Sequence, residues 1–223
     1  MKTNEELHRD VLAEIKWDPQ LMDVSAQISI SVNDGIVTLS GVVDTYGKKM
    51  AAERAAQRVT GVKIVACDLE VDPERKKTDI EIAEAVANAL YWNSAVNEDK
   101  IKIIVDDGWI YLDGTVDWEY ERVFATRSVE NLTGVRGVTN NISLKPKTAD
   151  AAGIKSKIAE AFKRRAIIDS SSIEIDQTGN RITLHGKVRS WAEKKEAGQI
   201  AWSTPGVTEV DNQIEVDTAV YAS

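Results

Sequence analysis

The chain has 223 residues, a formal net charge of −8 and 43% hydrophobic residues, with one cysteine and two histidines. A single cysteine excludes an intramolecular disulfide, and the acidic balance disfavours nucleic acid as a partner because like charges repel at long range. No apolar run is long enough to span a bilayer and the amino terminus has no apolar signal segment, so the sequence predicts a soluble, cytoplasmic protein.

An alternating apolar motif that ends in glycine occurs three times, and a Gly-Val pair follows each copy at the same distance. The motif glycines Gly41, Gly114 and Gly186 are 73 and then 72 residues apart. Because the motif and the Gly-Val pair keep the same separation in every copy, they indicate tandem copies of one small domain. Tandem copies are typical of binding or assembly rather than of one catalytic pocket. We place the three domains at residues 1–73, 74–146 and 147–223.

Each repeat begins with an amphipathic helix. In the first repeat, Leu7, Val11, Leu12 and Ile15 form one apolar stripe, and the other two repeats have stripes at matching positions. Two strands with alternating apolar residues follow, joined by tight turns rich in Asn, Asp and Gly. The period of two predicts a sheet with one buried face, which the helix covers.

A second helix follows in each repeat and leads to the glycine of the Gly-Val pair, which we expect to cap it in the left-handed conformation. A third strand completes the unit. The predicted second helices are residues 48–59, 121–132 and 193–202, and the predicted last strands are residues 65–71, 138–144 and 210–216. The fold class is therefore α+β, with three tandem αββαβ sandwiches, each a small three-stranded mixed sheet covered by two helices. The joining segments are short, so we expect the units to touch or to form a bent row.

The charge is unevenly shared among the repeats, with nets of −4, −4 and 0 in chain order. The third repeat is therefore the one that tolerates an anionic partner. Its cations close the first helix and surround the loop before the second: they are Lys163, Arg164, Arg165, Lys187, Arg189, Lys194 and Lys195. Cations at a helix C-terminus are also favoured by the helix dipole alone, so a simple capping role for the triplet stays open.

Aromatic residues mark the loop before the second helix in all three repeats. They are Tyr46, then Trp118 and Tyr120, then Trp191. Such rings can enter a bilayer interface or a partner's groove, and they are candidate lipid-binding or partner-binding residues together with the cations of the third repeat. The alternative is packing against the start of the helix.

Two further features have structural interpretations. Trp17 and Trp92 close the first helices of their repeats at matching positions, and we expect them to pack in a core or between domains. Cys67 stands where the other repeats have Asn140 and Asn212, and we interpret it as a small buried residue rather than a reactive thiol.

Catalytic and metal-binding patterns are lacking in the sequence. His8 and His185 have no partner at metal-ligand spacing, and we expect His185 to point to solvent. The neighbouring carboxylates of Asp106 and Asp107 occupy a hairpin turn, where local hydrogen bonding explains them. We therefore expect no enzyme, no metal and no cofactor.

The repeated positions resemble the BON domain of bacteria, a pattern of turn glycines and apolar strand residues that here covers essentially the whole chain. The resemblance is carried by Gly35, Val37, Leu39, Gly41, Gly61, Val62 and Leu69; by Gly108, Ile110, Leu112, Gly114, Gly134, Val135 and Ile142; and by Ile182, Leu184, Gly186, Gly206, Val207 and Ile214. It implies phospholipid or membrane interaction, envelope integrity, osmotic stress and no catalytic residues. Members of the family are usually exported, so the resemblance implies a periplasmic location as the alternative.

We therefore expect a non-enzymatic protein that binds anionic phospholipid or another macromolecule in osmotic or envelope stress. The alternative is a structural module for protein–protein contact or for self-association into a homo-oligomer, without a lipid role. Both depend on the repeats being separate units, each with its own core. A cleft that gathers polar groups from several repeats would speak against this interpretation.

Overall fold

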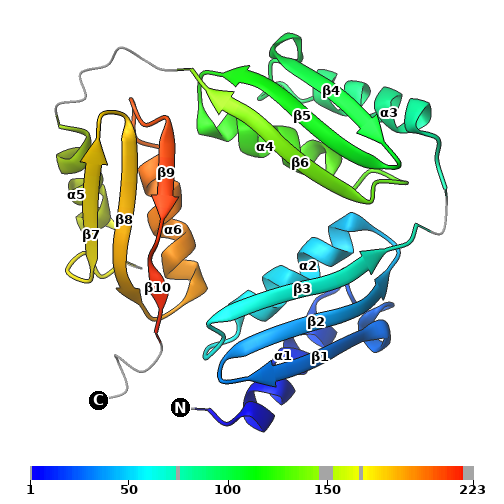
Figure 1. Cartoon of the computed structure of the whole chain (residues 1–223), viewed down its shortest axis with the longest axis horizontal. Coiled ribbons are helices and arrows are strands. Elements are labelled where there is room, and N and C mark those ends of the chain that lie inside the picture. The colour runs from blue at the N-terminus through cyan, green and yellow to red at the C-terminus, as the bar shows by residue number, and fades with distance from the viewer. Residues whose placement is uncertain (1, 74–75, 146–152, 166–167, 218–223) are drawn as a thin grey trace.

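The computed structural model describes residues 2–73, 76–145, 153–165 and 168–217. Three similar units lie around a common centre, and each turns its second helix toward the other two units (Figure 1). Parts of both joining segments, residues 74–75 and 146–148, lie outside the described residues.

The element order repeats from unit to unit. The first unit consists of α1 (Asn4–Trp17), η1 (Ser25–Gln27), β1 (Ile28–Asn33), β2 (Ile36–Val43), α2 (Tyr46–Arg58) and β3 (Ile64–Val71). The second consists of α3 (Asp79–Tyr91), η2 (Glu98–Lys100), β4 (Ile101–Asp106), β5 (Trp109–Val116), α4 (Glu119–Val129) and β6 (Gly137–Leu144). The third consists of α5 (Ile154–Arg164), β7 (Ile173–Thr178), β8 (Arg181–Val188), α6 (Trp191–Trp202), β9 (Glu209–Asn212) and β10 (Glu215–Val216).

Each sheet combines an antiparallel hairpin with a parallel third strand. In the first unit β2 is central, and it pairs antiparallel with β1 and parallel with β3. The second unit repeats this order around β5. In the third unit the last strand is interrupted, so that β9 and β10 pair separately with β8. The predicted α+β fold of three αββαβ units is confirmed.

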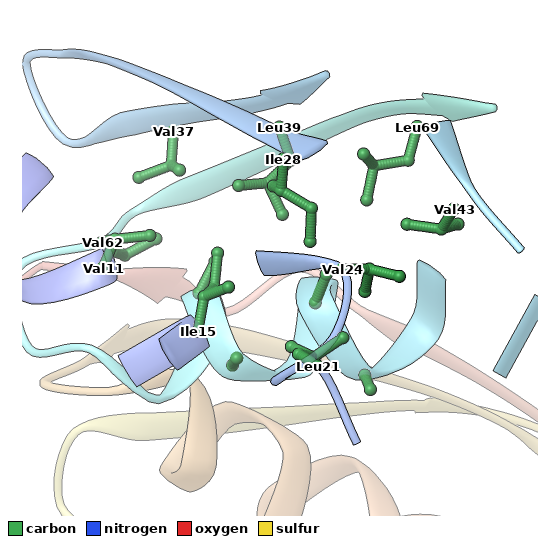
Figure 2. Close-up of a cluster of buried hydrophobic side chains, with 14 of the residues drawn as sticks. Val11, Ile15, Leu21, Val24, Ile28, Val37, Leu39, Val43, Val62 and Leu69 are labelled. Carbon is green, nitrogen blue, oxygen red and sulfur yellow. The ribbon is translucent and has the colours of Figure 1, made fainter. Parts of the chain in front are cut away.

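Every unit has its own hydrophobic core between the helices and one face of the sheet. In the first unit Val11 and Ile15 of α1 meet Val37 and Leu39 of β2, and the residues between helix and strand contribute Leu21 (Figure 2). The predicted apolar stripe is confirmed, except that Leu12 is only half-buried. The other two units have equivalent cores.

The motif glycines are required by the neighbouring strand. Gly41, Gly114 and Gly186 all have a positive φ, and a Cβ on any of them would collide with a backbone carbonyl of the residue before the first strand. The glycines of the Gly-Val pairs also have positive φ, but they lie in the turn after the helix. The prediction that they cap the helix directly is therefore wrong, because α2, α4 and α6 end several residues earlier.

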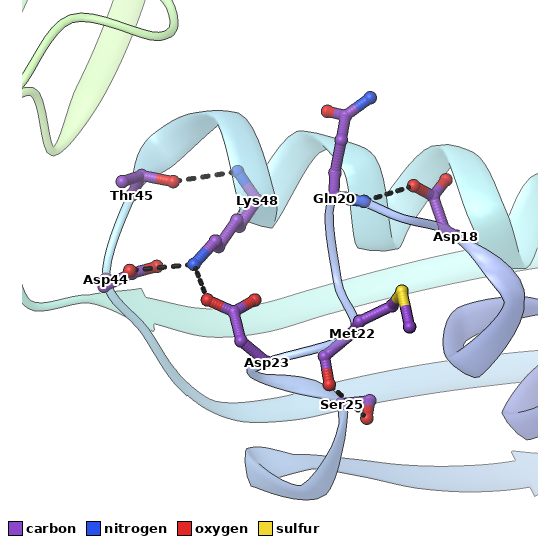
Figure 3. A network of polar contacts seen from close by, with 8 residues as sticks. All are labelled: Asp18, Gln20, Met22, Asp23, Ser25, Asp44, Thr45 and Lys48. Atoms are coloured by element: carbon purple, nitrogen blue, oxygen red, sulfur yellow. Dashed lines mark hydrogen bonds and ion pairs between the residues drawn. The ribbon is translucent and has the colours of Figure 1, made fainter.

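One position at the start of the second helix ties it to the loop after the first helix. In the first unit, the Nζ atom of Lys48 donates to Asp23 at 2.6 Å and to Asp44 at 2.8 Å (Figure 3). The hydrogen bond from Lys48 is the largest cause that holds the pKa of Asp23 below its usual range.

The third unit makes the same connection with the opposite charge. Glu193 is almost fully buried, and its two carboxylate oxygens accept from the backbone N–H groups of Asp169 and Arg189, both at 3.1 Å. Glu121 of the second unit accepts from two backbone N–H groups before α4. The three equivalent side chains thus fasten the start of the second helix in each unit, although one is a cation and two are anions.

An asparagine on the last strand fastens the second helix in two of the units. The amides of Asn140 and Asn212 donate to helix carbonyls at 2.9 Å and 2.8 Å and accept from the backbone two residues onward. Cys67 occupies this place in the first unit, half-buried against α2. Burial raises the pKa of its thiol, and a backbone hydrogen bond with Leu69 opposes this in part.

Gly114→Ala should destabilise the second unit by about 2 to 4 kcal/mol, because the new Cβ meets a backbone carbonyl that cannot move aside. The matched control is Gly179→Ala, since Gly179 also has a positive φ but has open space around its Cβ direction. Urea unfolding of both variants measures the difference. Equal losses of unfolding free energy would show that strain alone, rather than the strand contact, fixes this glycine.

Cys67 should react slowly with a thiol reagent at pH 8, because a raised pKa leaves less thiolate at any given pH and burial limits access. Labelling followed by absorbance should accelerate strongly when denaturant unfolds the chain. Equal rates for folded and unfolded protein would support the reactive-thiol alternative.

Candidate binding site between the units

Two aromatic side chains join the outer units to the middle one. Tyr46, at the start of α2, and Trp202, at the end of α6, both pack against the core of the second unit. Burial raises the pKa of Tyr46, as expected for a phenol removed from water. The first and third units also touch directly, because α2 contacts α6. The units are therefore closed on one another around their second helices.

Polar contacts reinforce these junctions. The guanidinium of Arg122 lies 4.3 Å from the centre of the Trp202 ring, at a distance where a cation and an aromatic face attract. Arg54 of α2 approaches Glu130 of the second unit at 3.8 Å. Gly47 is packed against Asn131 so closely that a Cβ would collide with its side chain.

A groove of about 430 Å³ lies between α4 and α6. Its walls combine exposed aromatic rings with positive charge, and we define this aromatic groove by Trp118, Tyr120, Phe124, Arg165 and Trp202. Tyr120 and Phe124 are in edge-to-face contact with ring centres 6.3 Å apart. The groove thus presents apolar surface of the second unit next to a cation of the third unit, Arg165.

The two acidic side chains that line the groove are each paired with a cation, whereas Arg127 of its lining has no ion pair among the described residues. Glu119 contacts Arg122 at 2.8 Å, and burial raises the pKa of Glu119. Arg165 contacts Glu196 at 3.4 Å. Because these pairs neutralise each other in part, the groove is more apolar than the count of its charges indicates.

A second cavity, of about 730 Å³, lies where the three second helices meet. We call it the central cavity. The side chains that define it come from all three units and are Met50, Arg54, Arg122, Arg127, Glu130, Trp191, Lys194 and Lys195. A cleft that gathers polar groups from several repeats is therefore present, contrary to expectation, and it weakens the sequence-based argument against an enzyme. It was missed because each repeat was considered by itself.

The lining of the central cavity consists mainly of charged and amide side chains. The described residues that line it include neither histidine nor cysteine. The hydroxyl of Thr126 donates to the carbonyl of Arg122 and accepts from the amide of Asn140, so it is occupied in structural hydrogen bonds. Within the described parts of the chain, no group of three or more His, Cys, Asp and Glu side chains could hold a metal ion.

The structure divides the predicted site residues among several places. Trp118, Tyr120 and Arg165 line the aromatic groove, whereas Trp191, Lys194 and Lys195 line the central cavity. Tyr46 lies in the junction between the first two units. The remaining cations are exposed: Lys163 and Arg164 end α5, Lys187 pairs with Glu215 and Asp217, and Arg189 pairs with Glu193.

Sequence reasoning missed Trp202, Phe124 and Arg127. A signal for Trp202 exists in the repeat alignment, because Gln57 and Glu130 occupy its place in the other units. A large aromatic residue at a position that is polar elsewhere indicates a contact specific to one copy.

Trp17 and Trp92 are 82% and 81% exposed. The prediction that they pack in a core or between domains is therefore wrong, because the helices end at these residues and the chain turns the rings outward. Trp92 contacts Tyr91 edge to face with ring centres 5.5 Å apart. His185, as expected, lies on the surface, 3.5 Å from Asp176.

The comparison with family models decides the relationship that the repeats suggested. The model of the BON domain matches residues 3–73, 78–146 and 150–218. The chain belongs to the BON domain family. None of the helices within the described residues is both long and apolar enough to pass through a bilayer.

A curated relative is the osmotically inducible protein Y of Escherichia coli (strain K12), 27% identical over 127 residues. The match covers 54% of this chain and 63% of that relative. Two solved structures of CdsD, a structural protein of the type III secretion system of Chlamydia trachomatis, match with TM-scores of 0.27 and 0.25 and identities of 12% and 13%. They cover 94% and 97% of this chain, and 91% and 100% of their own chains, but at these TM-scores they carry no argument.

Trp202→Ala should loosen the third unit from the second. The variant loses packing that contributes about 2 to 3 kcal/mol to the free energy of docking between the two units, and it loses the cation–aromatic contact with Arg122. Small-angle scattering should show a larger radius of gyration, and calorimetry should show the third unit melting separately. Trp92→Ala is the matched control, since its ring is exposed and should change neither measurement. A compact Trp202→Ala variant with one unchanged transition would contradict the closed arrangement.

Proposed function

We propose that this BON-domain protein is a non-enzymatic binder that attaches to anionic phospholipid surfaces during osmotic or envelope stress. The name of the relative from Escherichia coli supports the link to osmotic stress. The observation that carries the lipid interaction is the aromatic groove, in which exposed rings of α4 lie beside the cationic end of α5.

The composition of this region suits the boundary between headgroups and acyl chains. Trp118 and Tyr120 are partly exposed, and rings with an apolar body and a polar edge are favoured at that depth. Lys163 and Arg164 are exposed beside Arg165, so three consecutive cations can meet anionic headgroups. Each cation near such a surface contributes about 1 kcal/mol, while ions in solution screen the repulsion by acidic groups that lie further away than about 10 Å.

A second candidate function is attachment to a protein partner. The exposed Trp17 and Trp92 favour it, because isolated indole rings at matching places of two units are suited to a partner's pockets. In this alternative, which includes self-association, lipid has no role.

Lys163→Ser combined with Arg164→Ser should weaken binding to vesicles of phosphatidylglycerol and phosphatidylcholine about tenfold or more, because two attractive charges are lost. Flotation at low and high salt measures this, and binding of the parent chain should fall as ions screen the charges. The matched control is Lys155→Ser with Lys157→Ser, which removes two exposed charges from the other end of α5.

The outcomes separate the site from the function. Equal losses in the two double variants would show that net charge, and not this region, determines binding. A parent chain that does not float with anionic vesicles at low salt would overturn the lipid function. Light scattering of the Trp17→Ala and Trp92→Ala variants over a dilution series tests the alternative of self-association.

A further inference from the structure

The central cavity has an excess of positive charge in a protein whose net charge is −8. Five basic side chains line it against three acidic ones. The basic residues are Arg54, Arg122, Arg127, Lys194 and Lys195, and the acidic residues are Glu53, Glu119 and Glu130. A cleft lined by an excess of one sign of charge attracts small ions of the opposite sign more strongly than a surface of mixed charge does.

Ion pairs engage two of these cations, whereas the other three have no carboxylate within ion-pair distance, although Glu215 attracts Lys194 from further away and opposes in part the lowering of its pKa by burial. Arg122 is held by Glu119 at 2.8 Å, and Arg54 approaches Glu130 at 3.8 Å. For Arg127, Lys194 and Lys195, in contrast, no acidic side chain of the described residues lies within ion-pair distance. They come from two units, α4 and α6, so they face the cavity from two of its walls.

Lys194 and its neighbour Trp191 are the most distinctive part of this lining. The Nζ atom of Lys194 lies 5.3 Å from the centre of the Trp191 ring, and burial lowers the pKa of Lys194. The indole N–H of Trp191 is a buried donor that has no acceptor among the described residues. The partial removal of this ammonium from water disfavours its charged form, and an anion in the cavity would offset that cost.

The size and the remaining surface of the cavity indicate a small organic anion. A volume of about 730 Å³ is within the usual range for ligand sites, which frequently lie between domains. Met50, Val123 and the ring of Trp191 add apolar surface beside the charges. Several cations that converge from different helices suit an anion with more than one negative charge, and phosphate groups meet this requirement.

We propose that the central cavity binds a small phosphorylated molecule, whose phosphate lies among Arg127, Lys194 and Lys195. This site adjoins the aromatic groove proposed for membranes, since Arg127 lines both, but Lys194 and Lys195 line the central cavity alone. Since all three units line the cavity, the ligand would link them and stabilise their closed arrangement.

The test is calorimetric titration of the full chain with inorganic pyrophosphate and with adenosine diphosphate, with uncharged adenosine as the control ligand. The two phosphates should bind and raise the melting temperature, and adenosine should not. Lys194→Gln combined with Lys195→Gln should weaken pyrophosphate binding about tenfold. Lys155→Gln with Lys157→Gln, on the surface of α5, should leave it unchanged.

The pH dependence provides a second readout. Because the pKa of Lys194 is lower than usual in the free protein, this ammonium loses its proton earlier than an exposed lysine as the pH rises. An anion favours the protonated form, so binding should be accompanied by proton uptake in that alkaline range and should weaken as the pH increases further.

Three results would overturn the proposal. The first is the absence of heat and of a melting shift at pyrophosphate concentrations up to about 10 mM. The second is equal binding by the cavity and control variants, which would place the anion elsewhere. The third is displacement of pyrophosphate by phosphatidylglycerol vesicles, which would make this the membrane site. Conversely, if the variant Lys163→Ser with Arg164→Ser loses flotation but keeps pyrophosphate binding, the two sites are separate.

Discussion

The insertion of Tyr46 and Trp202 into the middle unit is the interaction on which the rest of the structure depends. Each unit folds around its own small core, and the short segments between units do not by themselves determine how the units are placed. The two rings fix this placement, because each transfers apolar surface from an outer unit to the core of the second. The aromatic groove and the central cavity exist only because the second helices are held close together in this way.

Repetition and divergence have separate physical tasks in this chain. The positions shared by all three units serve the fold: they are glycines that clear a neighbouring carbonyl and apolar strand residues. Some positions that differ lie at the junctions, as Gln57, Glu130 and Trp202 illustrate at one equivalent site. The contacts between the units are not equivalent, since Tyr46 of the first unit and Trp202 of the third both pack against the core of the second, and residues that differ between the copies make them.

The sequence predicted the fold well because its signals are local. Alternation along a strand, the stripe of Val11 and Ile15, and a glycine at a fixed spacing all report on contacts within one unit, where the partner is near in the chain. The ends of the second helices and the break between β9 and β10 were not predicted, because helix ends and strand continuity respond to small balances of hydrogen bonding. The exposure of Trp17 and Trp92 was not predicted, because the spacing of apolar residues along a helix does not show how far the sheet beneath it extends.

The binding regions were predicted only as a set of residues and not as places. Lys194 and Arg165 both belong to the third repeat, but one lines the central cavity and the other the groove. This division depends on how the units are oriented relative to one another, which no pattern within a single repeat encodes. A residue that breaks the repeat pattern toward a larger apolar side chain, as Trp202 does, was the available clue.

The contact between α2 and α6 has a consequence for the evolution of the chain. Open repeat arrays grow by duplication, since every added copy stacks on an exposed last neighbour. Here the first copy already contacts the last through α2 and α6. A fourth copy would therefore have no equivalent contact surface, and three copies complete the arrangement. Lengthening such a protein would demand that an existing junction be undone before a new one could form.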